Sequence, residues 1–196
     1  MSQITVPSRP LCVDLDGTLL EGDTIYDLSA SFLRAGFWRA GMLLVWLARG
    51  RPHFKRRLAE EAVLPLDRLP IHPEFVRFLR EQHDAGRTLV LVSASDEQTV
   101  RKVAAHFQIF SLAIGSDGKI NLRGQAKLQR LTQLYGAKGF DYAGNSHVDL
   151  PVWAGAAEAI LVDTPAGVER RARRIATVTR VFPRHRSRWQ LIRRLL

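Results

Sequence analysis

Residues Leu11–Leu20 read LCVDLDGTLL, an apolar run that ends in two aspartates, Asp14 and Asp16, followed at once by Gly17 and Thr18. The apolar run is typical of a parallel strand that is buried on both faces. Ligands of open parallel sheets bind beyond the carboxyl ends of the strands, and this stretch places both aspartates there. Two carboxylates this close raise each other's pKa unless a cation lies between them. We therefore expect a divalent metal, and magnesium fits best because it takes oxygen ligands and shares them with a substrate phosphate.

A simpler interpretation of the same stretch is a strand that ends in an ordinary Asp-Gly turn. Gly17 lets the backbone turn sharply, and Thr18 offers a hydroxyl and an amide to a phosphate. Both interpretations predict the strand, and they differ in the role of the two aspartates. The rest of the chain has to decide between them.

Further segments of the sequence alternate between strand and helix patterns. Short apolar runs predict strands at Thr88–Val92 and, more weakly, at Phe140–Ala143 and Ala159–Val162. Apolar residues at helical spacing predict helices at Pro73–Ala85, Asp96–Phe107 and Gln125–Tyr135. This alternation predicts an α/β fold, a Rossmann-like parallel sheet with helices on both faces.

Residues 23–67 break the alternation, because they show helical periodicity and no convincing strand. We therefore predict a core of residues 10–20 and 71–183, an all-helical insertion at 21–70 and a basic amphipathic tail at 184–196. The most apolar part of the insertion, Gly41–Ala48, is shorter than the roughly 20 residues that span a bilayer. It can be a buried helix or a face that touches a membrane.

The chain is basic, with 29 Lys and Arg against 19 Asp and Glu and a net charge of +10. Residues 169–196 hold ten arginines and one glutamate, so the excess belongs mainly to the end of the chain. Such a segment suits nucleic acid, lipid headgroups or a phosphorylated ligand. Within residues 184–196 tryptophan and aliphatic residues alternate with arginines, which favours an anionic membrane surface over nucleic acid and leaves a solvated helix open.

The single cysteine, Cys12, excludes an internal disulfide and a cysteine-rich zinc site. The first residues, MSQITVPSRP, lack the charged segment and apolar stretch that are typical of a secretory signal. We therefore expect a cytoplasmic protein. Two further options are a protein that lies peripherally at the inner face of the membrane and one that is the soluble part of a membrane protein.

Three later segments offer polar groups where a phosphate or a metal could bind. Ser93, at the end of the strand in LVSAS, can meet a phosphate oxygen, whereas Ser95 can be a helix cap or a second phosphate contact. Lys127 lies near a predicted helix start, where a cation is poorly placed unless it faces an anion, although a solvated surface lysine is the simpler interpretation. Asn145 can give a metal a neutral oxygen, and Asp149 can hold the metal's waters or the lysine.

The ordered pieces DLDGT, LVLVS, AK and GNSHVD resemble the haloacid dehalogenase (HAD) superfamily of phosphatases and cover about residues 10–163. The resemblance implies an α/β core with a helical C1-type cap. It implies that Asp14 is the nucleophile, that Asp16 is the general acid and base, and that Ser93 and Lys127 hold the phosphoryl oxygens.

The resemblance also implies a magnesium site and further phosphate contacts. The expected metal ligands are Asp14, Asp16 through its carbonyl, Asn145 and Asp149, and the expected phosphate contacts are Thr18, Ser93, Ala94 and Lys127. Asn145 stands where the family usually has an aspartate, and the lost charge should weaken magnesium binding. We expect a magnesium-dependent phosphomonoester hydrolase that forms an aspartyl-phosphate, and the alternative is a weakly catalytic or non-catalytic phosphate-binding module.

A narrower resemblance rests on SDGKINLRGQAK and FDYAGNSHVDLPVW, which are similar to HAD domains fused ahead of UbiA-type polyprenyl transferases in bacterial membrane proteins. In that group a basic segment precedes the first transmembrane helix, and RHRSRWQLIRRLL resembles it. This resemblance implies a prenyl or sugar phosphate as the substrate and leaves open a stand-alone relative or a piece of a longer protein.

Overall fold

The computed structural model describes residues 9–36, 38–117 and 120–183. Within them, one parallel sheet has the strand order β3-β2-β1-β4-β5-β6. The strands are β1 (Leu11–Val13), β2 (Leu89–Asp96), β3 (Leu112–Ser116), β4 (Asp141–Gly144), β5 (Ala159–Val162) and β6 (Val178–Phe182). The α-helices are α1 (Thr24–Arg34), α2 (Arg39–Ala48), α3 (Arg51–Glu61), α4 (Pro73–Asp84), α5 (Glu97–Phe107), α6 (Gln125–Tyr135), α7 (Leu150–Gly155) and α8 (Ala166–Ile175).

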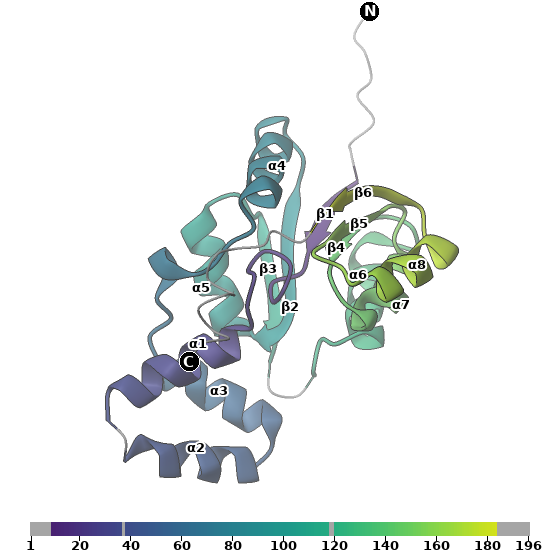
Figure 1. The fold of residues 1–196 in the computed structure, drawn as a ribbon. Helices are drawn as coiled ribbons and strands as arrows, with labels where there is room; N and C mark the ends of the chain where they lie inside the picture. Colours follow the sequence, from purple (N-terminus) through teal and green to yellow (C-terminus); the bar gives the residue numbers. More distant parts are fainter. Residues whose placement is uncertain (1–8, 37, 118–119, 184–196) are drawn as a thin grey trace, which may run out of the picture.

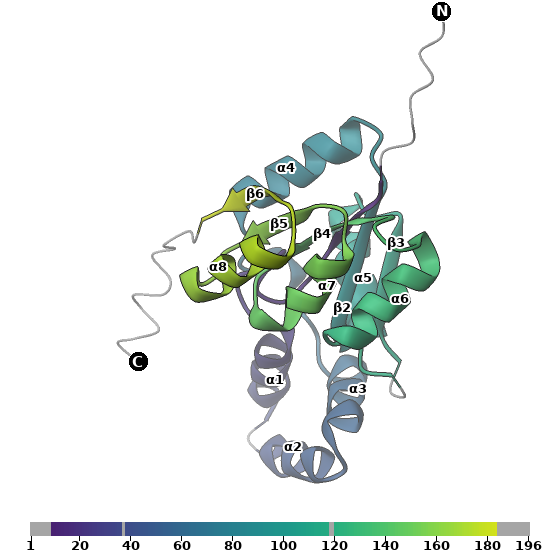
Figure 2. The same ribbon diagram turned by 90° about the vertical axis from the view of Figure 1, so that its right-hand side faces the viewer.

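Helices cover both faces of the sheet, as the alternating pattern predicts. Figures 1 and 2 show α4 and α5 on one face and α6, α7 and α8 on the other. Within β1, Leu11 and Val13 pack into the hydrophobic cluster on the α4 and α5 side, and Cys12 packs into the cluster on the opposite side. Successive side chains of a strand point to opposite faces, so a central strand covered twice has to be apolar at every position. The expected α/β fold is confirmed.

Helices α1, α2 and α3 form the all-helical segment that the sequence predicts after the first strand. We call residues 24–61 the helical insertion. It lies beyond the end of the sheet at which β1 finishes (Figure 1). Phe32 of α1 and Trp46 of α2 are buried with their ring centroids 4.9 Å apart, and Leu58 of α3 is buried with them. Buried aromatic contacts therefore hold the three helices together.

Two strands and two helices of the core were absent from the sequence prediction, and all four are partly exposed. The edge strands β3 and β6 carry exposed positions, so neither shows a continuous apolar run. Half of the residues of helix α8 are charged, and α7 is short. Strand β2 also runs past its predicted end, to Asp96, with a shift in its pairing with β3 after Val92.

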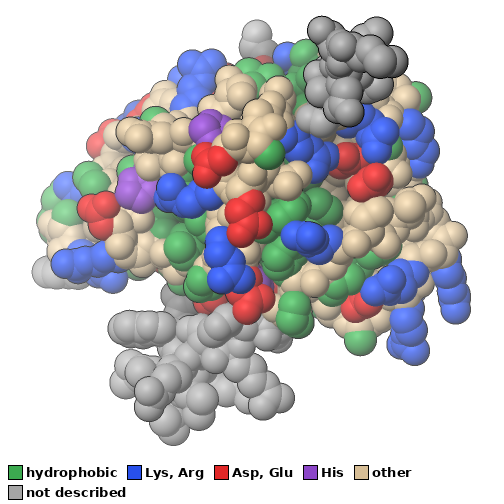
Figure 3. Space-filling view, turned by 90° about the horizontal axis from the view of Figure 1, so that it is seen from above, with side chains coloured by type: hydrophobic (Ala, Val, Ile, Leu, Met, Phe, Trp, Pro, Cys, Tyr) green, Lys and Arg blue, Asp and Glu red, His purple; other side chains and the backbone are tan. Residues whose placement is uncertain are grey.

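Figure 3 looks down on the side of the molecule that faces away from the helical insertion. Lys and Arg lie among Asp and Glu over this face, with no single continuous patch of either charge. At the starts of the strands, Asp141 accepts hydrogen bonds from Arg9 and Arg87. The basic tail predicted at 184–196 lies outside the described residues. In the part of the chain that the structure describes, no helix has the length and apolar character needed to cross a membrane.

Candidate active site

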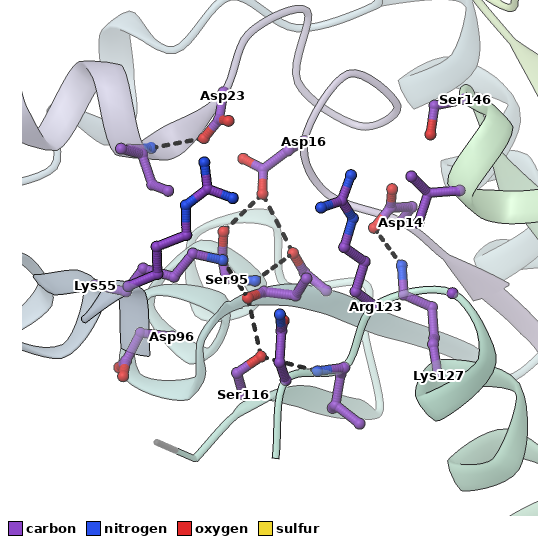
Figure 4. Close-up of a pocket in the computed structure, with 18 of the residues that line it drawn as sticks. Asp14, Asp16, Asp23, Lys55, Ser95, Asp96, Ser116, Arg123, Lys127 and Ser146 are labelled. Atoms are coloured by element: carbon purple, nitrogen blue, oxygen red, sulfur yellow. Dashed lines mark hydrogen bonds and ion pairs between the residues drawn. The ribbon is translucent and has the colours of Figure 1, made fainter. Parts of the chain in front are cut away.

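A cavity of about 530 Å³ lies at the carboxyl edge of the sheet and is lined by both the core and the helical insertion. It brings together most of the residues that the sequence singles out. These are Asp14, Asp16, Ser93, Ala94, Lys127, Asn145 and Asp149. Figure 4 shows Asp14 and Asp16 on one side of the cavity, with Lys127 reaching Asp14 from α6. Apart from Thr18, the residues that were predicted to form one site therefore line one pocket.

Asp14 and Lys127 form a buried ion pair. The Lys127 Nζ donates to Asp14 Oδ1 at 2.7 Å, and only 3% of Lys127 is exposed. The interpretation of Lys127 as a solvated surface residue is therefore wrong. Burial raises the pKa of Asp14 to about 7, and the positive charge of Lys127 opposes that rise.

Tyr142 of β4 links the lysine to Asp149, and sequence reasoning missed it. Lys127 Nζ donates to Tyr142 Oη at 2.8 Å, and Tyr142 Oη donates to Asp149 Oδ1 at 2.7 Å. Burial raises the pKa of Tyr142 well above its usual value, which keeps the hydroxyl protonated as a donor. Its position in an apolar strand makes it resemble an ordinary core tyrosine, so the sequence carried no signal for this role.

The second carboxylate oxygen of Asp149 organises the loop that carries Asn145. Asp149 Oδ2 accepts hydrogen bonds from the backbone N–H of Asn145 at 3.1 Å and from the backbone N–H of Ser146 at 3.0 Å. The Ser146 hydroxyl also donates to it at 3.1 Å. Asp149 therefore contacts the lysine only through Tyr142, and its role as a metal ligand stays a prediction.

The Asn145 side chain packs against Gly17 of the DLDGT turn. Gly17 has φ +78°, and a β-carbon at this position would collide with the Asn145 side-chain amide. Glycine is needed here for two reasons: the backbone is left-handed, and the side chain opposite leaves no space. This contact places the asparagine beside the backbone that directly follows Asp16.

Asp16 is held by groups from both the sheet and the helical insertion. Its Oδ2 accepts from the Ser95 hydroxyl at 2.7 Å and from the Ser93 hydroxyl at 3.3 Å. Its Oδ1 accepts from the backbone amide of Thr24, the first residue of α1, at 2.8 Å. The cap of α5 is Asp96, whose side chain accepts from the Gln98 amide, so Ser95 is not the helix cap that we considered.

Cations from the insertion and from the loop ahead of α6 complete the lining. Lys55 of α3 donates to the Ala94 carbonyl at 2.8 Å, and burial lowers the pKa of Lys55. Arg51 also lines the cavity, and Figure 4 shows Arg123 reaching toward the space between Asp14 and Asp16. Sequence reasoning missed these three cations because nothing in the chain distinguishes them from neighbouring basic residues. Only the packing of α3 and the loop against the core selects them.

Thr18 is the one predicted phosphate contact that does not line the cavity. Its side chain is buried, and its hydroxyl has no hydrogen-bond partner among the described residues. Its amide donates to the Leu15 carbonyl within the turn. This placement does not match the expected phosphate contact and suits a residue that shapes the turn.

The oxygen donors beside the cavity fit magnesium. Asp14 offers a carboxylate, Asp16 a backbone carbonyl and Asn145 a side-chain amide, and all three residues line the cavity. Among the described residues no group of three or more His, Cys, Asp or Glu is arranged to hold a metal. Magnesium needs only one or two carboxylates because waters and substrate oxygens fill the other positions. The donor set is therefore suitable for magnesium, with one charge fewer than an aspartate at position 145 would give.

Proteins similar to the chain in sequence or in structure match it over most of its length. It is 32% identical over 179 residues to the uncharacterized protein y4nM of Sinorhizobium fredii, covering 91% of this chain and 34% of the relative. The chain thus spans about a third of that curated protein. A protein of unknown function from Bordetella pertussis has a similar structure, with a TM-score of 0.64, 21% identity, and coverage of 88% of this chain and 98% of that one.

A second similar structure is a phospho-aspartyl intermediate analogue of phosphoserine phosphatase, with a TM-score of 0.60 and 14% identity. The match covers 96% of this chain and 99% of that one. At these identities the two structures establish a shared fold. The sequence match to the family described as haloacid dehalogenase-like hydrolase extends over residues 11–153, well over half of the chain. That span runs from the strand before Asp14 to the helix after Asp149, and the chain belongs to the haloacid dehalogenase-like hydrolase family.

Proposed function

We propose that the chain hydrolyses phosphomonoesters through an aspartyl-phosphate on Asp14. The observation that carries the proposal is the buried pair of Asp14 and Lys127 beside Asp16 in one cavity. A buried carboxylate paired with a lysine is a suitable nucleophile, because a transferring phosphoryl group needs a positioned attacking oxygen and neutralised charge. Membership of a hydrolase family supports the same chemistry.

In the proposed reaction, the Asp14 carboxylate attacks phosphorus in line with the leaving oxygen. Asp16 gives a proton to the leaving alcohol and later takes one from the water that cleaves the aspartyl-phosphate. Lys127 and Ser93 hold the phosphoryl oxygens, and Asp149 holds Lys127 in place through Tyr142. Magnesium held by Asp14, the Asp16 carbonyl and Asn145 would add positive charge beside the phosphoryl group.

A prenyl phosphate is the substrate that we propose ahead of a sugar phosphate. The side of the cavity formed by the insertion is partly apolar and includes Ile25, Tyr26, Leu47 and Phe54. Such a wall suits a hydrocarbon leaving group better than a sugar, which needs several polar partners. The similarity to HAD domains that precede UbiA-type transferases supports this choice, and we propose that the domain acts at the cytoplasmic face of the membrane beside such an enzyme.

The test is hydrolysis of prenyl, sugar and nucleotide phosphates by the purified chain with magnesium. We expect phosphate release from at least one of them, and Asp14→Asn should lower it to the background. The matched control is Asp84→Asn, which changes an exposed aspartate at the end of α4. Equal rates for the wild type and Asp14→Asn would refute the proposal.

A non-catalytic phosphate-binding module is the second candidate, and the observation that favours it is Asn145 where an aspartate would give the metal a second carboxylate. Calorimetry with a phosphate analogue would decide between the two functions. Binding without turnover, in the wild type and in Asn145→Asp, would support the module. Turnover by the wild type would exclude it.

A further inference from the structure

The outer face of helix α2 is wholly apolar. Residues 40–48 read AGMLLVWLA and contain no polar side chain. Trp46 is buried and Met42 and Leu43 pack against the core, whereas Leu44 is 70% exposed and Val45 53% exposed. A surface helix normally turns polar residues outward, and one that is hydrophobic all round is buried or lies in lipid. The question is therefore what covers the outer face.

The helical insertion around α2 carries positive charge and no negative charge over a long stretch. Between Asp27 and Glu60 the chain has seven Lys and Arg and no acidic residue, and two of the seven, Arg56 and Arg57, pair with Glu60 and Glu61 at the end of α3. Arg39 begins α2 and Arg49 follows its last residue. The Arg39 guanidinium lies 4.8 Å from the ring centroid of the buried Phe32 and 5.3 Å from that of Trp38, which is 61% exposed. An exposed tryptophan and arginines around an apolar face form the pattern of a helix at a lipid interface.

Helix α2 also lies where it can meet a flat surface. Both ribbon views place it at the outer end of the insertion, on the side of α1 and α3 away from the sheet (Figures 1 and 2). Leu47, 50% exposed on α2, and Arg51, at the start of α3, both line the cavity. The exposed face of α2 therefore adjoins the wall of the site.

We propose that α2 docks on an anionic lipid bilayer, with Leu44 and Val45 entering the interface and the flanking arginines meeting lipid phosphates. Burial of the apolar side chains and attraction between arginines and anionic headgroups add together in such binding. The docked position sets the wall formed by Leu47 and Arg51 next to the membrane. The binding does not require turnover, so it stands or falls separately from the phosphatase proposal.

Charge argues against a second copy of the chain as the occupant. Two such faces brought together would oppose their arginines, with no acidic residue between Asp27 and Glu60 to pair with them. Anionic headgroups supply the missing negative charge. A bilayer is therefore the occupant that satisfies both the apolar and the charged parts of this face.

The test compares the full chain with the double variant Leu44→Glu plus Val45→Glu in sedimentation with vesicles. The vesicles are phosphatidylcholine with or without phosphatidylglycerol. We expect the wild type to bind the anionic vesicles. The double variant should bind them at least about tenfold more weakly, because two apolar side chains no longer enter the interface. Leu134→Glu, which changes an exposed leucine on α6, is the matched control and should bind like the wild type.

A fluorescent probe separates docking of α2 from attraction by the rest of the chain. Cys12 is buried and its pKa is raised to about 12, so a thiol-reactive dye should label Leu44→Cys or Leu134→Cys at the new site alone. We expect anionic vesicles to shift the dye emission to the blue at position 44 and to leave it unchanged at position 134. Equal vesicle binding by the double variant, or no shift at position 44, would overturn the proposal. Self-association of the wild type that Leu44→Glu plus Val45→Glu abolishes, without vesicle binding, would overturn it in favour of a second copy.

Discussion

Gly17 is the residue at which the turn after Asp16 meets the loop of Asn145. We expect Gly17→Ala to lower both magnesium affinity and phosphatase activity, because the added methyl group meets the Asn145 side chain and the backbone has φ +78°. Strain from the left-handed conformation alone costs about 1–2 kcal/mol. Calorimetric titration with magnesium and an assay of phosphate release are the measurements.

Gly86→Ala separates strain from collision. Gly86 also has a left-handed backbone, with φ +80°, but a β-carbon there would have nothing within 4 Å. We expect this variant to lose about 1–2 kcal/mol in the free energy of unfolding, from backbone strain alone, and to keep its magnesium affinity. If both variants lowered magnesium affinity equally, the contact between Gly17 and Asn145 would not contribute to magnesium binding.

Asn145 gives a second prediction at the scale of one residue. Asn145→Asp adds a negative charge beside Asp14 and should raise magnesium affinity by on the order of tenfold, since a divalent cation gains a charged ligand in a partly buried site. Calorimetric titration with magnesium measures the change. His147→Asp adds the same charge at an exposed neighbouring position and is the control. Equal gains in the two variants would show that general attraction, and not ligation, is responsible.

At the scale of the elements, one tyrosine of strand β4 joins Lys127 of helix α6 to Asp149, the residue before α7. Tyr142→Phe removes the hydroxyl that connects Lys127 with Asp149 and leaves both buried charges short of a partner. We expect a loss of about 1–3 kcal/mol in the free energy of unfolding, because unsatisfied buried polar groups are costly. The kcat should also fall, since the lysine loses its orientation.

The control for this prediction is Tyr135→Phe, which removes a hydroxyl from a half-buried tyrosine of α6 away from the cavity. Urea unfolding and steady-state kinetics of the two variants give the comparison. A kcat that is unchanged in Tyr142→Phe while stability falls would show that the tyrosine serves only the fold.

Sequence reasoning found the central elements because they are buried on both faces, and it missed the edges because they are not. β5 and α6 have their predicted bounds, whereas β6, with Arg180 exposed in its middle, has no apolar run to detect. The same distinction holds in the site. Asp14 and Lys127 belong to sequence motifs that follow one another in a recognisable order. Tyr142 and Lys55 act through contacts between elements far apart in the chain, and local sequence patterns do not indicate such contacts.

Over the whole molecule, the cavity lies between the sheet and the helical insertion, and Asp16 spans that boundary through its bonds to Ser95 and to the Thr24 amide. A ligand bound in the cavity should therefore stabilise both parts together. Magnesium at about 100 times its dissociation constant adds about 2.7 kcal/mol to the free energy of unfolding. For a domain of this size, that corresponds to a rise in Tm of roughly 5–10 °C.

The rise in Tm should depend on pH and on Asp14. Burial holds the pKa of Asp14 near 7 in the absence of metal, so below about pH 7 a proton competes with magnesium for this carboxylate, and above it the carboxylate is free. We therefore expect a larger rise above pH 7 than below it, and little rise at any pH in Asp14→Asn. Thermal unfolding with magnesium chloride, against sodium chloride of equal ionic strength, measures both effects, and Asp84→Asn should behave like the wild type. A rise that is the same on both sides of pH 7, or that survives in Asp14→Asn, would place the metal somewhere other than this carboxylate.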